Sequence, residues 1–168
     1  MVEKNQADVL LKRVRCLLLL FVFALVLSGV TAFPLKWEVD ILAKTLGRNT
    51  SLGRHWPALA DWISFVHKGV TETHREYPFL FYGTDWLAFA HIVIAVAFIG
   101  PWRDPVKNVW VVQFGIIACV LVIPLALICG PIRGIPLFWR LGDCAFGVVG
   151  IVPLWLALRY IRRLERLA

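Results

Sequence analysis

The sequence predicts an all-α integral membrane protein, a four-helix bundle with amphipathic surface helices in its first outer loop. Three observations predict this class. Hydrophobic residues make up 60% of the 168 residues and the mean hydropathy is +0.74, whereas a soluble domain is about 45–50% apolar. Four apolar stretches approach the roughly 20 residues that a helix needs to cross a bilayer. Several of the eight Trp residues lie near the ends of these stretches, as in the aromatic belt at a lipid–water boundary.

The apolar stretches predict spans at 16–33, 85–102, 108–130 and 141–159. Their apolar residues run continuously and do not alternate with period two, so the spans are expected to be helices and not strands of a barrel. The remaining length leaves no room for a separate soluble domain. Residues 1–168 are therefore expected to form a single membrane domain.

The distribution of Lys and Arg predicts that both termini are cytoplasmic. With the N-terminus inside, three short cytoplasmic segments hold ten of the 18 basic residues, and six of the other eight are spread over the long outer segment 34–84. Basic residues concentrate in short cytoplasmic segments, which favours this orientation. The net charge of +7 comes from residues that flank apolar runs, which does not indicate a nucleic-acid partner.

The first apolar stretch has a second interpretation. Basic residues at 12–15, an apolar run and the small residues Val30-Thr31-Ala32 before Phe33 also fit a cleaved secretory signal. Cleavage would leave three spans and an outer N-terminus, whereas a retained helix gives four spans.

The outer segment 34–84 predicts two further helices. Trp37–Leu46, followed by Gly47, predicts a short one. A second helix is predicted to begin at Pro57 and end at Gly69, because apolar residues recur there at helical spacing: Trp56, Leu59, Ile63, Val66 and Val70. Both are expected to lie along the membrane surface with Trp and Leu in the interface, or to pack as a lid on the bundle. Residues 71–76 then form a polar turn.

No established catalytic motif occurs, so the candidate functional residues are ionisable groups at the outer ends of the last three spans. Polar residues within a membrane are costly, which makes each a candidate for function. These candidates are Asp85, His91, Arg133, Arg140 and Asp143. Asp143 and His91 could bind a proton or a metal ion, and Arg133 and Arg140 an anionic group such as a lipid head group. Asp85 or Thr84 also suits the N-cap of the second span.

Asp143 is the most informative candidate. Only 15 uncharged residues separate it from Arg159. That length is about 22 Å of helix, less than the hydrocarbon core of about 30 Å. We therefore expect Asp143 to lie within the outer leaflet and to face protein. Gly147 and Gly150 continue its helical face with small residues, which allow a neighbouring helix to approach closely.

A structural interpretation of these candidates competes with the functional one. His91 shares a face with small residues such as Ala88, so it could hydrogen-bond across closely packed helices. Asp143 could pair with Arg140, one turn earlier, or with Arg133. Such pairing would satisfy the charges without any ligand.

Metal, haem and disulfide sites receive less support. One His and two Asp lack a recognised metal-ligand spacing, and a b-type haem needs two facing His where only His91 lies in a span. Cys16 and Cys119 suit helix packing. Cys129 and Cys144 fall near the outer ends of spans three and four, where a disulfide could join them if that side is oxidising.

Two stretches resemble small uncharacterised bacterial multi-pass inner-membrane proteins. They are Gly83-Thr84-Asp85-Trp86-Leu87-Ala88-Phe89-Ala90-His91 and Gly130-Pro131-Ile132-Arg133-Gly134-Ile135-Pro136. The resemblance covers roughly residues 80–165. It implies a bacterial plasma membrane and no particular activity or cofactor.

Three functional hypotheses follow. The small size, the absent catalytic motif and the small-residue faces favour a non-enzymatic accessory or scaffold subunit, with the lipid bilayer and another membrane protein, or a second copy, as partners. The alternative is a small ligand-binding or catalytic protein with an outward-facing polar pocket. Transport through the bundle is disfavoured, because no inverted repeat occurs and the inner half of the spans lacks matching charges.

Overall fold

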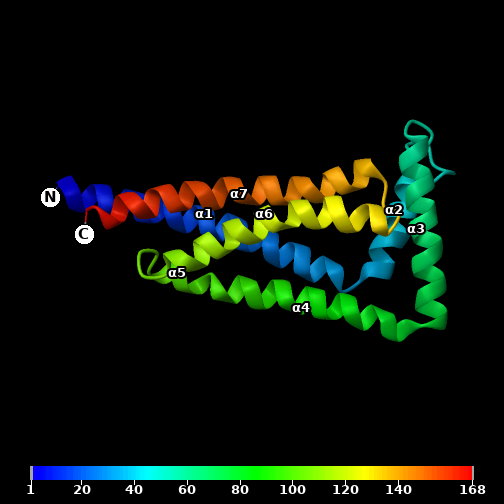
Figure 1. Cartoon of the computed structure of the whole chain (residues 1–168), viewed down its shortest axis with the longest axis horizontal. Coiled ribbons are helices and arrows are strands. Elements are labelled where there is room, and N and C mark those ends of the chain that lie inside the picture. The colour runs from blue at the N-terminus through cyan, green and yellow to red at the C-terminus, as the bar shows by residue number, and fades with distance from the viewer. Residues whose placement is uncertain (1, 168) are drawn as a thin grey trace. The chain divides into compact units, whose positions relative to one another are not determined.

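The computed structural model describes residues 2–167, and this part of the chain is all-helical. Four of its segments are long and apolar enough to cross a membrane (Figure 1): Asn5–Ala32, Pro78–Arg103, Val109–Ile132 and Leu137–Glu165. The chain divides into two compact units. Unit 1 comprises Met1–Ala24 and Ile94–Ala168, and unit 2 comprises Leu25–Val93.

Helices occupy all four predicted spans, and three of the spans are formed by single helices that extend beyond a predicted end. These are α1 (Val2–Ala32), α6 (Val109–Ile132) and α7 (Leu137–Glu165). The expected start at residue 16 is wrong because α1 continues through the basic residues at 12–15. A charge ends an uncharged stretch but not a helix, since Lys and Arg are good helix formers. α7 likewise continues beyond Arg159.

The second span is interrupted, which corrects the continuous helix expected over 85–102. It consists of a 3₁₀ helix and two α-helices: η1 (Pro78–Phe81), α4 (Tyr82–Ala97) and α5 (Ile99–Arg103). Pro101 has no N–H, so the carbonyl of Ala97, four residues earlier, loses its helical partner. The N–H of Phe98 donates to the carbonyl of Ala95 at 3.1 Å, which is a tighter turn.

A tight turn joins α6 to α7. Gly134 adopts φ +69°, a left-handed conformation that favours glycine because it has no Cβ. The N–H of Ile135 donates to the carbonyl of Gly130 at 2.9 Å, and that of Gly134 to the carbonyl of Pro131 at 3.0 Å. This pair of bonds is a Schellman motif, which satisfies two of the last carbonyls of α6. The turn returns the chain so that α6 and α7 lie side by side (Figure 1).

Small residues bring α7 into contact with the backbone of α6. A Cβ atom at Gly147 would overlap the carbonyl oxygen of Cys119, and one at Gly150 would lie 2.8 Å from Cys119 Sγ. From the α6 side, a Cβ at Gly115 would lie 2.8 Å from Leu154 Cδ1. The close-packing face predicted from Gly147 and Gly150 is therefore confirmed. This contact between α6 and α7 is called the glycine seam.

The core of unit 1 continues from the glycine seam to α1 and to the break at Phe98. Phe98 is 1% exposed, and its ring lies 5.0 Å from that of Phe21 between centroids. The buried core residues are Val14, Leu18, Phe98, Val112, Leu154, Ala157, Leu158 and Ile161. Side chains from α1, α6 and α7, together with Phe98, therefore form a small apolar centre.

Large apolar side chains point away from the protein on all four long segments. The exposed fraction is 67% at Phe23, 56% at Trp86, 62% at Ile128 and 77% at Phe146. Soluble monomers rarely expose contiguous apolar surface on this scale. In a bilayer, such side chains contact lipid while small residues make the contacts between helices. The fold is compatible with a multi-pass membrane protein.

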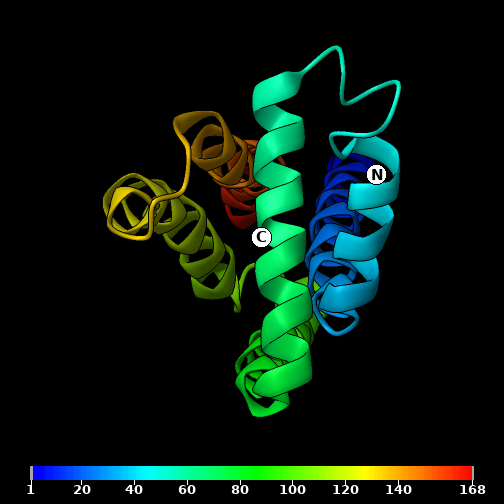
Figure 2. The same cartoon turned by 90° about the vertical axis from the view of Figure 1, so that its right-hand side faces the viewer.

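Unit 2 contains two helices that lie side by side and are joined by a loop (Figure 2). They are α2 (Leu35–Leu46) and α3 (Pro57–Glu76), and together they are called the α2–α3 hairpin. Gly47 follows α2, and Pro57 occupies the first turn of α3. The predicted end at Gly69 and the predicted polar turn at 71–76 are both wrong. One interior glycine costs a helix only about 1 kcal/mol, which the backbone bonds of the following turns outweigh.

Replacing Gly147 with Ala tests the glycine seam. The added methyl group would overlap the Cys119 carbonyl, so we expect the free energy of unfolding in detergent to fall by about 1–3 kcal/mol. Gly142→Ala is the matched control, since nothing lies within 4 Å of a Cβ there. The control should be neutral or stabilising by up to about 1 kcal/mol. An equal loss in both variants would contradict close packing at Gly147.

Candidate functional site

The five candidate residues predicted from the sequence are divided between the two units. Asp85 and His91 belong to unit 2, and Arg133, Arg140 and Asp143 belong to unit 1. The structure therefore groups them as a pair on α4 and a trio at the turn between α6 and α7.

Asp85 lies inside the first turn of α4, because that helix begins at Tyr82. The predicted N-cap position is therefore wrong. Thr84 does not cap the helix either, since its hydroxyl donates to the carbonyl of Phe81 at 2.7 Å. The 3₁₀ helix η1 leads directly into α4, which moves the helix start toward the N-terminus. The Asp85 carboxylate remains near the positive end of the helix dipole.

His91 contacts the end of α1 within unit 2. A Cβ atom at Gly29 would lie 2.8 Å from His91 Cβ and 3.0 Å from the carbonyl oxygen of Ala88, which is fully buried. The small-residue face predicted around Ala88 thus packs against a glycine. The His91 Nδ1 atom lies 2.7 Å from the carbonyl oxygen of Leu87 in its own helix. Because a carbonyl only accepts, Nδ1 carries the hydrogen. Within residues 2–167, His91 forms no hydrogen bond to another helix.

The trio at the α6–α7 turn has no ion pair within residues 2–167. The expected pairing of Asp143 with Arg140 or Arg133 is therefore not formed. The Arg140 side chain packs across α6 instead, where a Cβ at Gly130 would lie 2.7 Å from Arg140 Cγ. Arg140 Nε is buried there without a hydrogen-bond partner. A ligand-binding role for these three residues stays a prediction.

The four cysteines are free thiols in the structure. Cys129 is exposed and Cys144 is half-buried, and no disulfide joins them. Cys119 is a packing residue in the glycine seam, as its place in a helix predicts. Among the described residues, no group of three or more His, Cys, Asp or Glu side chains could hold a metal ion.

A polar cluster that the sequence did not reveal fastens the α2–α3 hairpin. One Asp40 carboxylate oxygen lies 2.7 Å from Lys36 Nζ, and the other lies 2.9 Å from His67 Nε2 on α3. The hydrogen bond from Lys36, with a further one from His67, holds the pKa of Asp40 below its ordinary value. The i, i+4 spacing of Lys36 and Asp40 is readable from the sequence. The contact with His67 depends on how the two helices meet.

A second polar contact closes the hairpin near its loop. The Arg48 guanidinium forms an ion pair with the Asp61 carboxylate, and the Arg48 backbone N–H donates to the Ser64 hydroxyl at 3.3 Å. Side-chain contacts thus stabilise the hairpin both near its loop, through Arg48 and Asp61, and at its middle, through Asp40 and His67. Large aromatic side chains nonetheless remain exposed on it, with exposed fractions of 64% at Trp37 and 68% at Phe65.

Comparison with protein-family models, curated proteins and solved structures found no match.

Replacing Asp40 with Asn should weaken the hairpin in a pH-dependent way. The folded-state pKa of Asp40 is lowered, so its ionised form adds stability above the unfolded-state pKa of about 3.9. That contribution disappears as pH falls through the lower folded-state pKa. We expect the thermal midpoint of the wild type to exceed that of Asp40→Asn at pH 6 and the difference to shrink toward pH 3.

A suitable control is Glu72→Gln, because Glu72 pairs at 3.9 Å with Lys68 on the same helix. It removes a carboxylate without removing a contact between α2 and α3. A difference between wild type and Asp40→Asn that stays constant or grows on acidification would contradict this role of the carboxylate.

Proposed function

We propose that this chain is a multi-pass integral membrane protein of a bacterial plasma membrane and acts as a non-enzymatic accessory or scaffold subunit. Four long apolar helices with outward-facing apolar side chains support the membrane location. Four crossings place both termini on one side. The concentration of ten basic residues in three short segments supports the cytoplasm as that side.

The observation that carries the accessory role is the preassembled α2–α3 hairpin. Its two helices are fastened to each other by the Asp40–His67 and Arg48–Asp61 contacts. A surface that is ordered before binding avoids part of the entropic cost of association. The hairpin is therefore suited to present a fixed shape to a partner.

The exposed side chains of the hairpin suit a protein partner. Trp37 and Ile41 lie one turn apart on α2, and Phe65 lies on the exposed side of α3. Aromatic residues supply most of the binding energy in many protein interfaces. In a helix that lies along a membrane, they also anchor the helix at the interface. We assign the hairpin to the outer face of the plasma membrane, with another membrane protein as its partner.

Photocrosslinking in intact membranes tests this role. A photoreactive phenylalanine analogue replaces Trp37 or Phe65, and the matched control replaces Phe146, which is also mostly exposed but lies on an apolar span. We expect a discrete protein adduct from a hairpin position and only lipid adducts from position 146. Absence of a protein adduct at both hairpin positions would contradict the accessory role. An adduct between tagged and untagged copies would identify self-association instead.

A further inference from the structure

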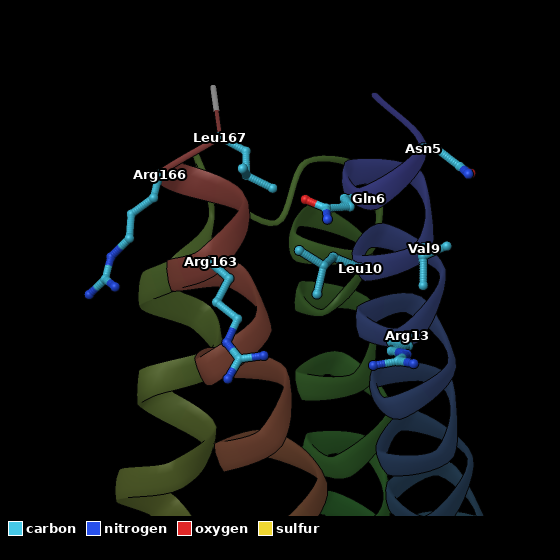
Figure 3. Close-up of a pocket in the computed structure, with 8 residues that line it drawn as sticks. All are labelled: Asn5, Gln6, Val9, Leu10, Arg13, Arg163, Arg166 and Leu167. Carbon is cyan, nitrogen blue, oxygen red and sulfur yellow. The ribbon is translucent and has the colours of Figure 1, made fainter. Parts of the chain in front are cut away.

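A groove in unit 1 gathers unpaired positive charge between the first turns of α1 and the last turns of α7 (Figure 3). Its volume is about 580 Å³. Arg13 comes from α1, and Arg163 and Arg166 come from α7. Apolar side chains line it beside these charges, including Leu10 and Leu167. The groove thus combines three guanidinium groups with apolar walls.

The guanidinium groups of the groove are available to a ligand. None of the three forms an ion pair within the described residues, and neither Asp8 nor Glu165 lines the groove. Figure 3 shows Arg13 on α1 and Arg163 on α7 on either side of the space between the two helices, with Leu10 and Gln6 in that space and Arg166 extending away at the end of α7.

Arg13 is held in place without using its hydrogen-bond donors. Its guanidinium carbon lies 5.7 Å from the centre of the Tyr160 ring. This is a cation–π contact near the limit of about 6 Å. Arg13 forms no hydrogen bond or ion pair within residues 2–167, so its N–H donors, in a fork that matches the oxygens of a phosphate, are free. Arg13 is therefore positioned by Tyr160 while its hydrogen-bond donors remain free.

Length along the two helices places Arg13 and Arg163 at the level expected for lipid head groups. At a rise of 1.5 Å per residue, Arg13 lies about 4.5 Å beyond Cys16, where the uncharged stretch of α1 begins. On α7, Arg163 lies about 6 Å beyond Arg159 by the same measure. Each polar layer of a bilayer is roughly 5–8 Å deep, because the bilayer is about 40–45 Å thick and its hydrocarbon core about 30 Å.

We propose that this groove is a binding site for the head group of an anionic phospholipid of the leaflet that faces the two termini. The inference rests on the proposed membrane location. Arg13 and Arg163 donate hydrogen bonds to the phosphate, and Arg166 adds a third positive charge. The head-group depth of Arg13 and Arg163 favours a lipid over a free phosphate ion.

Native mass spectrometry of the full chain in mild detergent tests this site. The protein is mixed with equal amounts of phosphatidylglycerol and phosphatidylcholine that carry the same acyl chains. The test variant is Arg13→Gln, Arg163→Gln. The matched control is Lys12→Gln, Arg162→Gln, which removes two charges from neighbouring exposed positions on the same helices that do not line the groove. A parallel sample contains inorganic phosphate in place of lipid.

The wild type and the control should retain phosphatidylglycerol in preference to phosphatidylcholine. In the test variant, the ratio of bound phosphatidylglycerol to bound phosphatidylcholine should be at least about tenfold lower. Equal retention in the test and control variants would overturn the site. Binding of inorganic phosphate without a preference for the anionic lipid would overturn the lipid as its occupant. Alkaline extraction of membranes reports the membrane location separately. A protein that stays in the membrane pellet without lipid preference therefore refutes this site and not the proposed function.

Discussion

The contact of α7 with the backbone of α6 at Gly147 is the constraint on which the rest of unit 1 depends. Helices in lipid gain little from burying apolar surface against each other, so their association relies on close approach and van der Waals packing. Gly147 and Gly150 allow that approach at Cys119, and Gly115 allows it at Leu154. The left-handed conformation of Gly134 reverses the chain direction directly after α6, so that α7 packs against α6.

The same constraint explains where large and polar side chains lie. Because small residues occupy the contacts, bulky side chains such as Phe146 remain on the outer surface, where lipid can cover them. Polar contacts are found instead in the α2–α3 hairpin, around Asp40 and Arg48. In unit 1, Arg13 and Arg163 form no ion pair within residues 2–167. Unit 2 therefore carries a hairpin held by polar contacts, and unit 1 carries a basic groove beside its apolar helix contacts.

The sequence predicts the helical class and the four apolar segments, because composition and the length of uncharged runs report them directly. It misplaces helix ends, since charges at 12–15 end a hydropathy run without ending α1. The break at Phe98 was readable in principle from Pro101. The Asp40–His67 contact was not, because it joins residues 27 apart through packing of two helices. For Arg140, spacing predicted a bond along α7, whereas Gly130 leaves room for the side chain on α6.

The central claim is that the chain crosses a membrane four times with the α2–α3 hairpin outside. Cysteine labelling in cells tests it most directly, after replacement of the native residues Cys16, Cys119, Cys129 and Cys144. A single cysteine is then placed at Asn49 in the hairpin loop or at Lys107 between α5 and α6. A membrane-impermeant maleimide should label Asn49→Cys in intact cells and Lys107→Cys only after lysis. Labelling of both positions in intact cells would contradict four crossings in this orientation.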